Sequence, residues 1–228
     1  MKTISSRANP QPIHMLFFAI FAVLLCLLLL ALTAPTDFVE TLVREGGLVE
    51  TLSAAGYLVV IASLVRETTA KFLRQHWYFL IIPMAMCLRE LDFHNLWTTT
   101  SITRLDFYLS SIVPAHEKLA AILMIAIIAF SGCVMFARHW KSFWNGLVIG
   151  NPVAIAIGLA GLAVVASKTL DGLPRKLAEI GIGSNVDFAV TANAVEEILE
   201  LGIPLFLMAA VFAYYPTPRV RTQHRDIG

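Results

Sequence analysis

The sequence predicts an all-α fold: a polytopic bundle of six transmembrane helices with both termini on the cytoplasmic side. Three observations lead to this class. First, of the 228 residues 57% are hydrophobic and only 14% are charged, whereas a soluble domain carries about 25% charged residues. Second, the mean hydropathy is +0.73 and the apolar residues gather in six long runs. Third, basic residues are concentrated in alternate connections between these runs.

Each predicted span has enough apolar residues to cross a hydrocarbon core, which takes about 20 residues of helix. The spans cover residues 13–33, 48–65, 77–94, 119–137, 147–167 and 193–215. The first contains an unbroken apolar block from Met15 to Leu32. Because this block is longer than the core of a signal peptide, which has about 7–15 residues, we expect a retained membrane anchor.

The later spans are recognised by their ends and by the polar residues inside them. The second span is closed by Arg66 and Glu67, and the third begins at Trp77, an aromatic residue suited to the membrane interface. The third and sixth spans also contain charged residues, which makes their hydropathy signals weaker. Charged residues within a span are rare and mark either functional sites or buried ion pairs. These two spans are therefore the main candidates for carrying a site.

The charged residues divide unevenly between the two sides of the predicted bundle. The side with both termini has ten basic and two acidic residues, and the other side has seven basic and fourteen acidic residues. Because short cytoplasmic loops are enriched in Lys and Arg, this division predicts an N-in, C-in topology. Residues 1–12 and 217–228 are then cytoplasmic tails of one membrane domain, residues 1–228. The chain has no N-x-S/T glycosylation site, and we expect it in a bacterial inner membrane.

The expected partner is the lipid bilayer. A net charge of +1 gives no overall basic field for nucleic acid. In the fifth span, Ala154, Gly158 and Gly161 would let another helix approach closely, either within the chain or in a homodimer. The aromatic and basic segment 138–144 is predicted to be an inner loop that anchors the protein at anionic lipid.

Polar residues gather at the outer ends of the third, fifth and sixth spans. The candidate site residues are Arg89, Glu90, Asp92, His94, Lys168, Asp171, Glu196, Glu197 and Glu200. If the third helix continues, Glu90 and His94 share one face because they are four residues apart. A charge at the bilayer centre costs about 2.5–3.5 kcal/mol on insertion scales. So many costly residues at one depth predict an outward-facing polar site between these three spans.

One interpretation of this site is a metal-dependent hydrolase that acts on a lipid or lipid-linked substrate. Carboxylate and imidazole groups are suitable ligands for a divalent metal, and the predicted ligands are Glu90, His94, Asp171 and Glu200. Glu90 or Glu200 would act as the general base. The residues predicted to bind substrate or ions are Arg89, Asp92, Lys168, Asp171, Glu196 and Glu197. The sequence contains no HExxH metal-binding motif.

Two other interpretations use the same residues. In a proton- or cation-coupled carrier, Glu90 and Glu200 would bind the coupling ion, and Pro83 and Pro204 would provide movable half-helices. In a non-catalytic scaffold, Arg89 or Lys168 would neutralise these glutamates in structural ion pairs. The sequence alone leaves open whether the protein is an enzyme.

Overall fold

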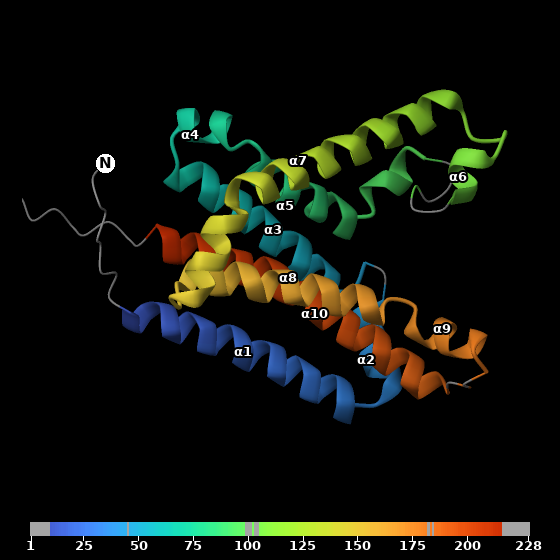
Figure 1. The fold of residues 1–228 in the computed structure, drawn as a ribbon. Coiled ribbons are helices and arrows are strands. Elements are labelled where there is room, and N and C mark those ends of the chain that lie inside the picture. Colours follow the sequence, from blue (N-terminus) through green and yellow to red (C-terminus); the bar gives the residue numbers. More distant parts are fainter. Residues whose placement is uncertain are drawn as a thin grey trace, which may run out of the picture.

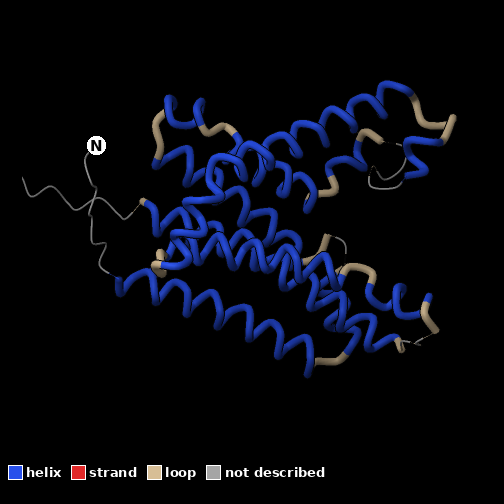
Figure 2. The backbone as a smooth tube through the Cα atoms, viewed as in Figure 1, coloured by secondary structure: helices blue, strands red, loops and turns tan. Residues whose placement is uncertain are grey.

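The computed structural model describes residues 10–44, 46–98, 102, 105–181, 183 and 185–215. These described residues form helices and loops without a β-strand, so the predicted all-α class is confirmed (Figure 2). The helices are α1 (Pro10–Thr33), α2 (Thr36–Val43), α3 (Leu48–Glu67), α4 (Ala70–Gln75), α5 (Tyr78–Glu90), the 3-10 helix η1 (Phe93–Leu96), α6 (Leu105–Leu109), α7 (Ala115–Val148), α8 (Pro152–Leu170), α9 (Leu173–Glu179) and α10 (Val186–Tyr214).

Four segments of the described chain are long and apolar enough to cross a membrane. They are Ile13–Thr33, Thr36–Glu67, Ala115–Val148 and Pro152–Leu170, which correspond to α1, α2 with α3, α7 and α8. The other two predicted spans are also helical, as α5 and α10. Helix α5 has 13 residues. At 1.5 Å per residue it is about 20 Å long, shorter than a hydrocarbon core of about 30 Å.

Helix α10 forms the centre of the bundle. It packs against α8, α3, α1 and α2, and α3 in turn packs against α5. The core between these helices contains Tyr57, Ala160, Ile203 and Phe206, all of them buried. Helices α3 and α10 approach closely at Gly56, where an added Cβ atom would lie 2.9 Å from the Cβ atom of Pro204.

The short connections make successive long helices run in opposite directions, so the bundle has two distinct ends (Figure 1). The first end, here called the basic end, holds α4, the start of α5, the end of α7 and the end of α10. The opposite end, here called the acidic end, holds α2, α6, α9 and the start of α10. The described connections that were predicted to share a side of the membrane therefore lie at the same end of the bundle.

The third predicted span, residues 77–94, is wrong at its end. Helix α5 stops at Glu90, and a turn leads to η1 at Phe93. Asp92 in this turn has a φ angle of 45°, a left-handed conformation that a right-handed helix cannot contain. Glu90 and His94 therefore do not share a face of one continuous helix.

The predicted inner loop at residues 138–144 is also wrong. These residues are the last turns of α7, which continues to Val148. The next helix starts at Pro152 and is capped by Asn151, whose side chain accepts a hydrogen bond from the backbone N–H of Val153. Proline is tolerated at this first position because its missing N–H would have no helical partner there.

The small residues of the fifth predicted span serve packing within the chain. Ala154, Ala156, Ala160 and Ala163 of α8 are buried, and α8 packs against α10. Gly161 is exposed, with open space where a Cβ atom would lie. These observations account for most of the small residues without a second copy of the chain.

Candidate functional site

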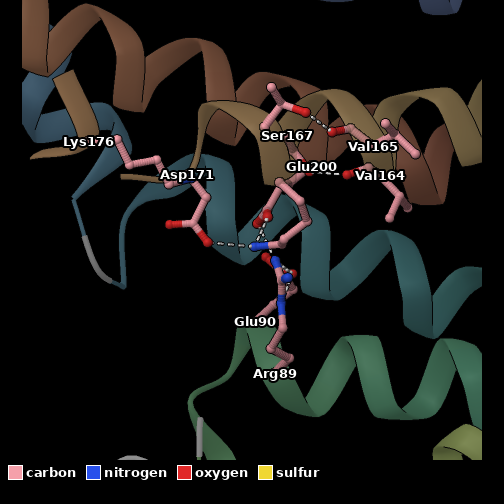
Figure 3. Close-up of polar contacts among 10 residues, drawn as sticks. Arg89, Glu90, Val164, Val165, Ser167, Asp171, Lys176 and Glu200 are labelled. Atoms are coloured by element: carbon pink, nitrogen blue, oxygen red, sulfur yellow. Dashed lines mark hydrogen bonds and ion pairs between the residues drawn. The ribbon is translucent and has the colours of Figure 1, made fainter. Parts of the chain in front are cut away.

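Three helices bring charged side chains together towards the acidic end of the bundle. Helix α5 contributes Arg89 and Glu90 at its last turn, and α10 contributes Glu200. Helix α8 contributes Lys168 near its end, with Asp171 as the residue that caps it. Arg89, Glu90, Lys168 and Asp171 lie at the ends of α5 and α8, whereas Glu200 lies midway along α10. Figure 3 shows Arg89, Glu90, Asp171 and Glu200 within one region.

The five side chains form one continuous chain of ion pairs. The Nε and Nη2 atoms of Arg89 donate to Oε1 of Glu90 at 3.2 and 2.9 Å. Nη2 of Arg89 also pairs with Oε2 of Glu200. Nζ of Lys168 lies 3.2 Å from Oε1 of Glu200 and 3.3 Å from Oδ2 of Asp171. The contact with Glu200 is an ion pair without hydrogen-bond geometry, because Oε1 has no hydrogen-bond partner.

Burial differs between the carboxylates and the cations of this chain. Glu90 and Glu200 are 5% and 4% exposed, whereas the side chains of Arg89 and Lys168 are 36% and 46% exposed. A buried carboxylate is costly unless a cation or hydrogen-bond donor compensates it. Arg89 therefore holds two buried carboxylates in place and links α5 to α10, while Lys168 links α8 to α10.

Two further glutamates of α10 make the site richer in carboxylates than in cations. Glu196 and Glu197 form no ion pair within the described residues, and Oε2 of Glu197 is buried without a hydrogen-bond partner. Glu197 interacts electrostatically with Glu200 and Glu90, and Glu196 interacts with Asp171. The described site thus contains five carboxylates, and its cations Arg89 and Lys168 pair with three of them.

The structure adds Tyr57 of α3, a residue that the sequence reasoning missed. Tyr57 is completely buried, its hydroxyl has no hydrogen-bond partner, and it lies within electrostatic reach of Glu90, Arg89 and Glu200. In the sequence, Tyr57 is a single tyrosine within the apolar stretch of residues 54–62. Hydropathy treats such a residue as part of the core, so only its position in the fold identifies it.

A cavity of about 170 Å³ lies beside the ion-pair chain. It is lined by Gly46, Glu50, Thr51, Glu90, Leu91 and Asp92. Glu90 therefore contacts Arg89 on one side and borders the cavity on another. The backbone N–H of Gly46 donates to Oε2 of Glu50 at 2.6 Å. Asp92, predicted to join the other carboxylates, lines this cavity and is not part of the ion-pair chain.

The predicted metal ligands are only partly described. Glu90, Glu200 and Asp171 each pair with a cation, while the side chain of His94 lies outside the described residues. Among the described side chains, no group of three or more His, Cys, Asp or Glu residues is placed to hold a metal ion. The four-residue metal site therefore stays a prediction.

Comparison of the chain with models of protein families, with curated proteins and with solved structures found no match.

Proposed function

We propose that the protein is a six-span membrane carrier that binds a proton or a cation at its carboxylate-rich site. In this proposal α5 and α10 join the four long apolar segments as spans. The basic end faces the cytoplasm with both termini, and the acidic end faces outward from a bacterial inner membrane. The distribution of basic residues supports this orientation, because cytoplasmic connections carry the excess of Lys and Arg.

The observation that carries the proposal is the buried, unpartnered carboxylate oxygen of Glu197. A charged carboxylate in a medium of low polarity needs a compensating donor or cation, and without one it takes up a proton. The carboxylates of Glu200 and Glu90 lie within electrostatic reach of Glu197, so this oxygen stands in an acidic part of the site. Such a group exchanges a proton, or binds a cation, when its surroundings change.

Pro204 provides a second supporting argument. It lies inside α10, four residues after Glu200. Since proline has no N–H, the backbone carbonyl of Glu200 loses its usual helical donor. Backbone carbonyls without a helical donor coordinate the coupling ion in transporters with interrupted helices; α10 continues through Pro204 and leaves this one carbonyl without its donor. Glu200 thus offers both a carboxylate and a backbone oxygen in one region of α10.

The two other interpretations explain less of the described geometry. Structural ion pairs account for Glu90 and Glu200 but leave the buried oxygen of Glu197 without a role. The hydrolase needs a metal site, whereas its predicted ligands Glu90, Glu200 and Asp171 are each paired with a cation. Within the part of the chain that the structure describes, no group of three or more His, Cys, Asp or Glu side chains is placed to hold a metal ion.

Infrared titration of the purified protein in lipid nanodiscs tests the proposal. We expect the absorption band of a protonated carboxyl group in the wild type near neutral pH and its loss in Glu197→Gln. Glu179→Gln is the matched control, because Glu179 is an exposed glutamate at the end of α9. The proposal fails if the wild type lacks this band and no added cation changes the carboxylate bands. It also fails if Glu197→Gln responds like the wild type.

A further inference from the structure

A surface at the basic end combines exposed cations with exposed tryptophans. Its residues are Lys71 and Arg74 of α4 and Arg138, Trp140, Lys141 and Trp144 of α7, and they are here called the α4–α7 surface. No acidic residue occurs in segments 68–89 and 118–170, which contain this surface. Its positive charge is therefore not neutralised by carboxylates of the same segments.

Arg138 of α7 contacts α4 and the start of α5. Its Nη1 atom donates to the backbone carbonyl of Gln75 at 3.2 Å, and its guanidinium carbon lies 5.8 Å from the ring centre of Tyr78. The hydroxyl of Tyr78 in turn forms a hydrogen bond of 2.8 Å with Nε2 of His139. These contacts hold one face of the guanidinium against the protein, while the exposed remainder of Arg138 can donate to an external group.

The tryptophans give the surface its depth in the membrane. Trp140 and Trp144 are 41% and 48% exposed, and their rings form an edge-to-face pair with centroids 5.3 Å apart. Helix α7 has 34 residues and is therefore about 50 Å long, which exceeds a hydrocarbon core of about 30 Å. Its last turns thus extend into the headgroup region, where tryptophan is enriched.

We propose that the α4–α7 surface binds the headgroup of an anionic phospholipid. The phosphate would accept hydrogen bonds from Arg138 and from the neighbouring Lys and Arg side chains, and the tryptophans would contact the upper acyl chains. Charge complementarity and the position beside an apolar span favour a lipid as the occupant. The inference depends on the membrane location of α7 and not on the proposed carrier function.

Tryptophan quenching by brominated lipids tests this inference on the full chain in mixed nanodiscs. We expect brominated phosphatidylglycerol to compete better than brominated phosphatidylcholine for the wild-type surface. Each neutralised cation should lower this preference about fivefold, since a basic residue near an anionic surface contributes about 1 kcal/mol. The test variant is Arg138→Gln/Lys141→Gln, and Arg175→Gln/Lys176→Gln on α9 at the other end is the matched control.

A second variant keeps the test decisive if loss of Arg138 disturbs the fold. Lys71→Gln/Arg74→Gln removes two exposed cations of α4 and leaves the contacts of Arg138 intact. It should show a similar loss of preference for phosphatidylglycerol. The inference is overturned if the wild type has no preference, if neither α4 nor α7 variants change it, or if the α9 control loses it equally.

Discussion

At the scale of single residues, Arg89 is the cation on which the ion-pair chain depends. Among the described residues it is the cation that contacts both buried carboxylates, Glu90 and Glu200. Lys168 contacts one of them and the exposed Asp171. Because removing one partner of a buried pair leaves an uncompensated charge, the cost of a substitution follows the burial of the group left behind.

We therefore expect Arg89→Gln to destabilise the protein more than Lys168→Gln. The loss should be about 3 kcal/mol, at the lower end of the range for a broken buried pair because Arg89 is partly exposed. Thermal unfolding in detergent measures the difference. The double variant Arg89→Gln/Glu200→Gln should recover part of the loss, since it removes one of the stranded carboxylates. Equal stability of the two single variants would contradict this ranking.

The two buried tyrosines provide a second residue-scale prediction. The hydroxyl of Tyr57 has no partner, whereas that of Tyr78 bonds His139 at 2.8 Å. Removing an unsatisfied hydroxyl is neutral or stabilising, while removing a satisfied one costs about 1 kcal/mol. We expect Tyr57→Phe to keep or raise the unfolding temperature and Tyr78→Phe to lower it. Equal destabilisation by both would mean that the hydroxyl of Tyr57 has a bound partner in solution.

At the scale of elements, α3 and α10 are in close contact one helical turn from Glu200. An added Cβ atom at Gly56 would clash with Pro204, which is four residues from Glu200. We expect Gly56→Ala to cost about 1–3 kcal/mol, the usual cost of overpacking a core. Gly132→Ala in α7 is the control, because open space surrounds that position. A similar unfolding temperature for both variants would show that α3 and α10 can separate without cost.

The sequence predicted the elements better than it predicted their ends. The six predicted apolar runs all contain helices, of which α5 is the short one with 13 residues, because a long apolar run has few alternatives to a helix. Helix α5 ends early because Asp92 adopts a left-handed backbone conformation, which apolar patterning does not reveal. Helix α7 continues past Trp144, although its aromatic and basic last turns have too low a hydropathy to be assigned to a span. The sequence predicted that polar residues of the third, fifth and sixth predicted spans lie together. Only the structure shows that Arg89 pairs with both Glu90 and Glu200.

At the scale of the whole molecule, the bundle has a basic end and an acidic end. The N-in, C-in orientation predicts that a reporter active only in the cytoplasm works when fused after residue 228. The same reporter should be inactive when inserted at Gly183, in the connection between α9 and α10, because α9 and the start of α10 lie at the acidic end. Activity at both sites, or only at Gly183, would contradict the proposed topology. A homodimer through the small-residue face of the fifth predicted span also stays a prediction, which light scattering of the detergent-solubilised protein tests.

Ion movement across a membrane is the most direct test of the central claim, that the carboxylates of α10 bind a proton or cation during transport. The measurement is the rate of internal pH change in liposomes that contain the protein, with a membrane potential imposed and candidate cations added in turn. We expect a protein-dependent flux that Glu197→Gln and Glu200→Gln each reduce at least tenfold, while Glu179→Gln transports like the wild type. Flux that is absent under every cation condition, or unchanged in both α10 variants, would contradict the central claim.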